Sequence, residues 1–151
     1  MPKKSPNLIY FEAVGRRKSA VARVRLYLAT KEKSVSIEGN KIKTGDILVN
    51  KKPMIEFFTL RTQQTRFFKP LDLSDSKDRF AISILVKGGG KRGQLDAIVH
   101  GLTRAIAKSD TEKFRPLFKK EGMFTRDARI RERRKVGKGG KARRQKQSPK
   151  R

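Results

Sequence analysis

Cysteine is absent from this 151-residue sequence, and histidine occurs once, as His100. Without cysteine the chain can form neither a disulfide nor a thiolate metal site. A single histidine cannot build a multi-histidine zinc site or a pair of imidazole acid and base groups. We therefore expect no metal site and no cofactor, and we interpret His100 as a hydrogen-bonded structural residue of the helix in which it is expected to lie.

Long apolar runs are missing as well. None approaches the roughly 20 residues that a transmembrane helix requires. The N-terminal sequence MPKKSPNLIY is basic, but the apolar segment typical of a secretory signal does not follow it. These absences predict a cytoplasmic protein without a membrane partner.

Acidic residues are scarce: 14 Asp and Glu stand against 40 Lys and Arg, which gives a net charge of +26. Such an excess of like charge disfavours a compact state unless a polyanion neutralises it. Nucleic acid and an anionic membrane are the two candidates. Nucleic acid is favoured, because phosphate neutralisation releases condensed counterions and because the most basic segment of the chain has no apolar face.

The charge divides the chain into two parts. Residues 126–151 contain 13 Lys and Arg but only 2 Asp and Glu, with very few apolar side chains. Such a segment cannot bury enough surface to offset its ordering entropy, so we expect it to stay disordered until it meets a polyanion. The domains that we predict are a basic N-terminal segment at 1–7, a globular RNA-binding domain at 8–125 and an extended basic tail at 126–151.

Alternating apolar and polar residues predict strands at 8–14, 19–29 and 79–87. Residues 34–45 alternate too, and Gly39-Asn40 indicates the turn of a hairpin. In the second strand Val24, Leu26 and Leu28 alternate with Arg23, Arg25 and Tyr27. In the last strand one apolar face is expected to contain Phe80, Ile82, Ile84 and Val86.

Helical spacing of apolar residues predicts a helix over 93–108. Residues 51–68 are also helix-like, and Ser109-x-x-Glu112 resembles a capping box for a short helix that ends near Gly122. Strands that share a core with few helices indicate a mixed α/β (α+β) domain, in which helices pack on a small mixed sheet.

A glycine-rich loop, Gly88-x-Gly90-x-x-Gly93, joins the last predicted strand to the long predicted helix. This spacing matches the dinucleotide-binding fingerprint. A dinucleotide site also needs a second parallel strand after the helix, however, and the sequence after Ile106 predicts a further helix and then the tail. The Walker pattern fails because Gly90-Lys91 is followed by Arg92. A nucleotide-dependent enzyme is therefore disfavoured.

The same loop suits a backbone phosphate of RNA or DNA. Glycines allow close approach of the backbone, a helix N-terminus offers free N–H groups, and Lys87, Lys91 and Arg92 add positive charge. The alternative is a turn that only requires positive φ at its glycines.

A second basic motif, Arg16-Arg17-Lys18, lies between two predicted strands. Three consecutive basic residues in a tight turn form a compact phosphate-binding feature. Ordinary surface charge is the alternative interpretation.

Three blocks of the sequence occur in a recognisable order and spacing, namely AVGRRKSAVARVRL, VKGGGKRGQLDAIVHGLTRAI and TRDARIRERRKVGKGGKARR with a terminal KR. Together they closely resemble the small-subunit ribosomal protein S-nine family in its bacterial form. The resemblance implies a small domain of the ribosomal S-five second-domain type, seated on ribosomal RNA and beside neighbouring proteins in the head of the small subunit. It also implies a C-terminal tail that runs through RNA toward the decoding site.

The resemblance assigns roles to individual residues. Contacts with ribosomal RNA are implied for the basic turn and the glycine loop, at Arg16, Arg17, Lys18, Lys87, Gly88, Gly89, Gly90 and Lys91. Further contacts are implied along the tail, at Arg126, Arg129, Arg133, Arg134, Lys135, Arg143 and Arg144. The final pair, Lys150 and Arg151, is implied to reach the anticodon stem-loop of transfer RNA in the peptidyl site. The family's tail typically ends Gln-Phe-Ser-Lys-Arg, whereas this chain has Ser148 and Pro149 before the final pair.

We therefore expect a structural RNA-binding protein of the small ribosomal subunit, bacterial or organellar, that supports translation and is not an enzyme. Two other hypotheses make different predictions. A nucleoid-type DNA-binding protein would bind duplex DNA and would not travel with ribosomes. An enzyme would bind a nucleotide cofactor even at high salt, whereas a phosphate-backbone binder loses affinity steeply as salt rises.

Overall fold

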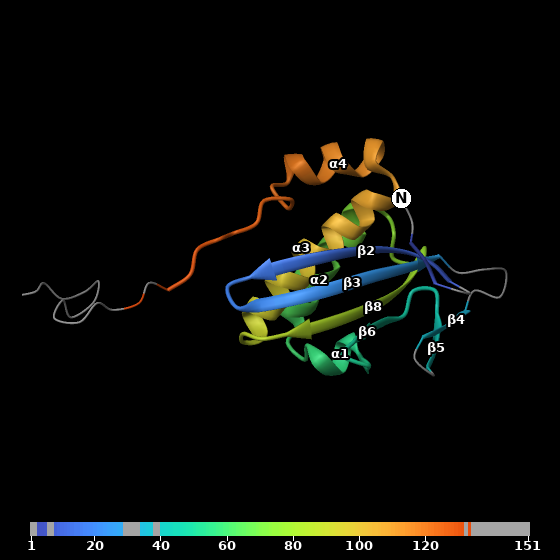
Figure 1. Ribbon diagram of the computed structural model, residues 1–151, viewed down its shortest axis with the longest axis horizontal. Helices are drawn as coiled ribbons and strands as arrows, with labels where there is room; N and C mark the ends of the chain where they lie inside the picture. Colours follow the sequence, from blue (N-terminus) through green and yellow to red (C-terminus); the bar gives the residue numbers. More distant parts are fainter. Residues whose placement is uncertain (1–2, 6–7, 29–33, 38–39, 132, 134–151) are drawn as a thin grey trace, which may run out of the picture.

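The computed structural model describes residues 3–5, 8–28, 34–37, 40–131 and 133. Its centre is a six-stranded sheet in the order β1-β2-β3-β8-β6-β7 (Figure 1). The strands are β1 (Lys3–Ser5), β2 (Leu8–Arg17), β3 (Ala20–Leu28), β6 (Ile47–Val49), β7 (Lys52–Pro53) and β8 (Phe80–Lys87). Only β6 and β8 pair in parallel; the other neighbours are antiparallel. The expected mixed sheet is thus confirmed.

A separate antiparallel hairpin and four helices complete the described fold. The hairpin consists of β4 (Ser34–Ile37) and β5 (Asn40–Lys43), as the alternation at 34–45 predicts. The helices are α1 (Met54–Phe57), α2 (Arg61–Leu73), α3 (Lys91–Ser109) and α4 (Thr111–Lys120). In Figure 1, α2 and α3 lie against one face of the sheet, while α4 lies beyond the end of α3 and precedes the tail. The α+β class predicted from the sequence is confirmed.

The core lies between the sheet and α3. Val24 and Leu26 of β3 and Ile82 of β8 are fully buried, and they pack in one cluster with Ile98 and Leu102 of α3. The predicted apolar faces of 79–87 and of 93–108 are therefore the faces that meet. Because apolar burial is the main favourable contribution to folding, this contact fixes α3 on the sheet and fixes the loop that precedes it.

Two glycines allow α3 to approach β2 more closely than side chains would permit. A Cβ atom on Gly15 of β2 would lie 1.9 Å from the carbonyl oxygen of Ala97 and 2.3 Å from the amide nitrogen of Gly101. No real Cβ is accommodated at such distances, so the backbones of strand and helix are in contact here. This contact places the basic end of β2 beside the first half of α3.

The second face of the sheet has a small apolar cluster of its own. Tyr27 is 3% exposed and packs with Ile42 and Ala81, while Tyr10 lies 5.5 Å from it, ring centroid to ring centroid. The alternation in β3 predicts Tyr27 on the face opposite Val24 and Leu26, and the sequence pattern does not indicate that this face is buried at Tyr27. Ile42 of β5 belongs to this cluster, so part of this second face of the sheet is covered.

Residues 51–68 do not form one helix. They comprise the edge strand β7, the single-turn helix α1 and the start of α2, which continues to Leu73. The backbone is extended at Phe58 and again at Leu60, and this interrupts the helix. The short strands β6 and β7 have too few residues to show an alternation, so the sequence pattern missed them.

The cap of α4 is Asp110 and not Ser109. One Asp110 carboxylate oxygen accepts a hydrogen bond from the backbone N–H of Lys113 at 3.1 Å. The Ser109 hydroxyl instead donates to the carbonyl oxygen of Ile106 at 2.7 Å, because Ser109 is the last residue of α3. The predicted helix start is therefore displaced by one residue.

Candidate nucleic-acid interface

The two basic loops singled out in the sequence touch each other. A Cβ atom on Gly88 would lie 2.4 Å from the carbonyl oxygen of Ser19, and one on Gly89 would lie 3.1 Å from the Cβ of Ala20. The cause is the antiparallel pairing of β3 and β8, which sets Val21 opposite Lys87. The β2–β3 turn and the glycine loop therefore form one surface at one end of the sheet (Figure 1).

The three glycines of the loop at 88–90 differ in whether the backbone conformation requires them. Gly88 and Gly89 have positive φ values of 73° and 64°, which L-residues with side chains rarely adopt, so the turn itself requires them. Gly90 has a φ of −97°, and a Cβ added there would meet no atom of the described part of the chain within 4 Å. The turn geometry thus explains two glycines, and it leaves open space above Gly90 at the start of α3.

The start of α3 adjoins this open space at Gly90. Gly90 is the N-cap residue of α3, and among the residues that the structure describes no side chain makes a capping hydrogen bond there. The first N–H groups of a helix have no partner within the helix, and the helix dipole is positive at this end. An anion placed above Gly90 would find both hydrogen-bond donors and positive potential.

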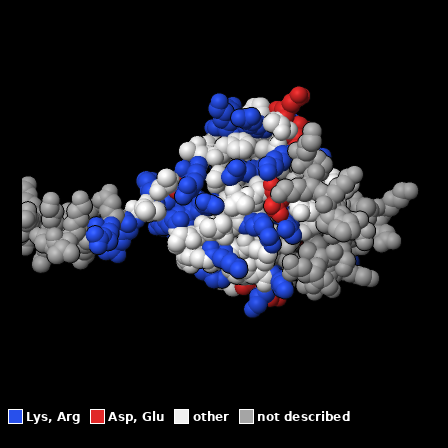
Figure 2. Space-filling view, in the orientation of Figure 1, with Lys and Arg blue, Asp and Glu red and all other residues white. Residues whose placement is uncertain are grey.

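Exposed basic side chains surround the two loops. Arg16 and Lys18 of the first loop and Lys87 and Arg92 of the second are all exposed. Lys18 has a φ of 51°, so the turn holds it in the left-handed conformation. Figure 2 shows Lys and Arg gathered where the tail leaves the globular part. The sequence-predicted residues are therefore brought together, and they form a compact cationic surface.

Lys91 is held by the protein itself. Its ammonium group donates to the carbonyl oxygen of Phe57 at 3.1 Å and lies 3.5 Å from the centroid of the Phe57 ring. The lysine thus joins the start of α3 to α1, in addition to contributing charge to the surface.

Arg17 differs from its two neighbours, because its guanidinium group is directed toward the chain and not outward. Its side chain is 15% exposed. Nη1 donates to the carbonyl oxygens of Arg129 at 2.7 Å and Asp127 at 3.3 Å, and Nη2 lies 2.9 Å from an Asp127 carboxylate oxygen. Nε lies 3.6 Å from a carboxylate oxygen of Asp96. Arg17 therefore binds the beginning of the tail to the globular part.

Two acidic residues complete this network. Asp127 accepts hydrogen bonds from the side chain and the backbone N–H of Arg129, and these bonds hold the pKa of the Asp127 carboxyl well below its usual value. Arg66 Nη2 lies 2.9 Å from the second carboxylate oxygen of Asp96, in an ion pair without hydrogen-bond alignment. Sequence reasoning missed Asp96, Asp127 and Arg66 as partners of the basic motif. The one sequence feature that could have indicated a partner for the basic motif is Asp127, the single aspartate of the basic tail.

The described part of the tail presents its basic residues to solvent. Residues 126–131 and 133 form no helix or strand, and Arg126, Arg129 and Arg133 are exposed. The other predicted tail contacts lie outside the described residues, namely Arg134, Lys135, Arg143, Arg144, Lys150 and Arg151.

His100 is a half-buried residue of α3 beside the basic turn. Its Nδ1 accepts the backbone N–H of Arg16 at 3.5 Å. Burial lowers the pKa of the imidazole below its ordinary value, and the nearby charge of Arg104 lowers it further; a hydrogen bond with the backbone of Phe124 acts in the opposite direction. A neutral, hydrogen-bonded imidazole agrees with the structural role predicted from the sequence.

The topology does not support a dinucleotide site. The parallel partner of β8 is β6, which precedes β8 in the chain, and within the described residues no strand follows α3. Among these residues no cluster of three metal-ligating side chains occurs. Nor does any described helix have the length and apolar character needed to cross a membrane.

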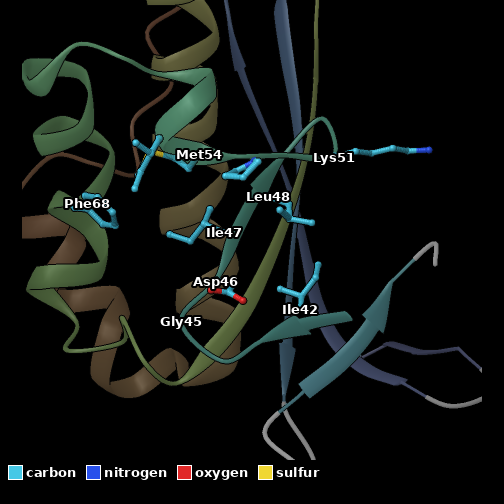
Figure 3. A pocket seen from close by; sticks show the side chains of 10 residues that line it. Ile42, Gly45, Asp46, Ile47, Leu48, Lys51, Met54 and Phe68 are labelled. Atoms are coloured by element: carbon cyan, nitrogen blue, oxygen red, sulfur yellow. The ribbon is translucent and has the colours of Figure 1, made fainter. Parts of the chain in front are cut away.

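A separate pocket lies along the edge of the sheet between β6, α1 and α2. It is lined mainly by apolar side chains, including Ile47, Met54 and Phe68, while Lys51 extends away from them (Figure 3). Asp46 at its margin accepts the backbone N–H of Lys43 at 3.0 Å. The apolar lining does not suit a phosphate, so this pocket is not part of the candidate interface.

Comparison with known proteins identifies the family. A family described as ribosomal protein S9/S16 matches residues 15–151 of the chain. A relative from Maridesulfovibrio salexigens, the small ribosomal subunit protein uS9, is 42% identical over 128 residues, which cover 85% of this chain and 87% of the relative. The match includes both basic loops, α3 and the whole tail. The chain therefore belongs to the ribosomal protein S9/S16 family, whose members are structural, non-enzymatic components of the ribosome.

Proposed function

We propose that this protein is a constituent of the small ribosomal subunit that binds small-subunit ribosomal RNA through its two adjoining basic loops and its tail. The observation that carries the proposal is the contact between the Ser19 carbonyl and Gly88, which unites the loops in one cationic surface. Its relative of the same family is a small-subunit protein, which supports this assignment. The protein has a binding role and performs no catalysis.

The chemistry of the surface suits a phosphate backbone. A phosphate above Gly90 would accept hydrogen bonds from the free N–H groups at the start of α3. Arg16, Lys18 and Lys87 would neutralise neighbouring phosphates and release their counterions. Contacts of this type fix position and orientation on the RNA without reading its bases.

The tail extends the same binding mode away from the globular part. Arg126, Arg129 and Arg133 are exposed where it begins. The RNA contacts predicted for Arg134, Lys135, Arg143 and Arg144 belong to this proposal, as does contact of Lys150 and Arg151 with transfer RNA in the peptidyl site. A basic segment of this composition can follow RNA into spaces that a folded domain cannot enter.

The first test is whether the protein travels with small subunits. Cell lysate is separated on a sucrose gradient in high-salt buffer, and the protein is followed by mass spectrometry. We expect it in the small-subunit fractions at about one copy per particle. Recovery at the top of the gradient, or together with DNA, would contradict the proposal.

The second test asks whether the loops form the binding surface. The double variant Arg16→Gln, Lys18→Gln is added to small subunits that lack the protein. We expect the slope of log affinity against log salt to become shallower by about 1.5, since two phosphate contacts are lost at about 0.7–0.9 each. The control is Lys77→Gln, Arg79→Gln, which removes two charges beside the opposite end of β8. Equal slopes for the two variants would refute the role of the loops.

A further inference from the structure

We propose that Arg17 is a positioning residue that latches the start of the tail to the globular part, and that Arg16 and Lys18 are the residues of the basic turn that contact RNA. The latch consists of Arg17, Asp96, Asp127 and Arg129. The part of this inference that concerns RNA affinity rests on the proposed function. The part that concerns the geometry of the tail does not.

Each of the three guanidinium nitrogens of Arg17 lies near a carbonyl or carboxylate oxygen of the protein. Nη1 and Nη2 are engaged with the backbone and carboxylate of Asp127 and with the backbone of Arg129, and Nε faces Asp96. A guanidinium group in this position cannot also form a bidentate contact with a phosphate. Arg16 and Lys18, on either side of it in the sequence, are exposed. The three basic residues of the motif therefore divide into two kinds.

The latch joins parts of the chain that are more than 100 residues apart. The bonds from Arg17 to Asp127 and Arg129 span 110 and 112 residues. Asp127 is also bound by Arg129 through two side-chain hydrogen bonds of 3.0 and 2.8 Å. Two carbonyl oxygens of the tail, together with one carboxylate, are thereby fixed against the end of β2. The tail leaves the globular part next to the two basic loops (Figure 1).

Fixing the start of the tail would favour RNA binding by pre-organisation. If the first tail residues already point along the surface that the loops form, less conformational entropy is lost when the tail meets RNA. Asp127 has a negative charge inside a cationic, RNA-facing region, and simple electrostatics would make it unfavourable for binding. Its pairing with Arg17 and Arg129 gives a physical reason for its presence.

The decisive variant is Asp127→Ala, because the two interpretations predict opposite signs. If Asp127 only adds negative charge, its removal strengthens binding to small subunits that lack the protein. If Asp127 holds the latch, removal weakens binding by about three- to tenfold, because the tail must then be ordered on binding. The control is Asp78→Ala, which removes one exposed carboxylate beside the opposite end of β8. We expect unchanged or slightly stronger binding for this control.

The salt dependence separates a latch from an RNA contact. Loss of the latch removes no phosphate contact, so Asp127→Ala should leave the slope of log affinity against log salt unchanged. Arg17→Lys keeps the charge but cannot reproduce the planar fork that reaches two carbonyl oxygens and a carboxylate. We expect it to behave like Asp127→Ala. If Arg17→Lys binds as tightly as the wild type, the contribution of the latch to RNA affinity is refuted.

The geometry of the tail can be measured without RNA. Because the chain has no cysteine, Thr62→Cys and Ile130→Cys introduce unique positions for spin labels on α2 and on the tail; both side chains are exposed. We expect a narrow distance distribution in the otherwise wild-type protein and in the Asp78→Ala control, and a broad one with Asp127→Ala or Arg17→Lys. Equal distributions in all four proteins would overturn the latch. If none of the proteins binds small subunits, the proposed function fails while the distances still test the latch.

Discussion

Gly15 of β2 and Gly101 of α3 are in contact through their backbones: a Cβ on Gly101 would lie 3.0 Å from the amide nitrogen of Gly15. This contact brings His100 to the backbone of Arg16, and the basic end of β2 to α3. The position of the basic turn relative to the helix therefore depends on two residues without side chains, neither of which contributes charge to the surface.

Substitution of Gly15 should destabilise the protein. In Gly15→Ala the new methyl group would overlap backbone atoms of Ala97 and Gly101, which cannot move without displacing α3. Overpacking of this kind costs about 1–3 kcal/mol and occasionally more. Urea denaturation followed by circular dichroism measures the free energy of unfolding. An unchanged midpoint for Gly15→Ala would show that strand and helix separate more easily than this contact indicates.

Gly90 should matter for binding and not for folding. An added methyl group meets no atom of the described residues within 4 Å, so Gly90→Ala should change the free energy of unfolding by less than about 1 kcal/mol, as expected at an N-cap position. The same methyl group would occupy the space proposed for a phosphate. We expect affinity for small subunits lacking the protein to fall about fivefold, which corresponds to one hydrogen bond of about 1 kcal/mol. If Gly90→Ala and the wild type bind with equal affinity, no phosphate is bound above Gly90.

The stability of the protein should depend on pH through His100. The folded state lowers the pKa of this imidazole, so the unfolded chain binds the proton first as the pH falls below about 6.5. The contribution of His100 is therefore complete above that pH and is lost as the pH falls toward the folded-state pKa. One group changes the free energy of unfolding by at most about 1.4 kcal/mol per pH unit, and less here because the side chain is partly screened by solvent.

Comparison with His100→Asn isolates this effect. Asparagine keeps an acceptor near the position of Nδ1 but does not titrate. Between pH 7 and pH 5 the free energy of unfolding should fall more steeply for the wild type than for the variant. Parallel curves would mean that the imidazole has the same pKa in the folded and unfolded states.

Removal of the last two residues should affect transfer RNA and not assembly. A chain that lacks Lys150 and Arg151 keeps every other basic residue of the tail, so we expect normal incorporation into small subunits. We also expect weaker binding of transfer RNA in the peptidyl site and poorer maintenance of the reading frame. A filter-binding assay and a frameshift reporter measure the two effects. If both match the full-length protein, the tip has no such role.

Much of the fold could be predicted from local patterns. The strands around Val24 and Ile84 and the helix that contains Leu102 follow from periodicity, because one buried face repeats every second or every third to fourth residue. The irregular stretch at 51–68 was predicted incorrectly as one helix, because an edge strand of two residues and a single helical turn leave no periodic signal. The burial of Tyr27 could not be predicted for a different reason, since residues distant in the sequence form a second cluster that covers its face of the sheet.

The sequence by itself determined the net charge, the basic composition of the tail, the two basic loops and the family. Those properties depend on which residues are present and on their order along the chain. Only the tertiary structure decided that Ser19 meets Gly88, and that Arg17 binds Asp127 while Arg16 remains exposed. Three adjacent basic residues look alike in a sequence. Their surroundings differ because strand pairing and helix packing bring distant carboxylates and carbonyl groups to one of them and solvent to the others.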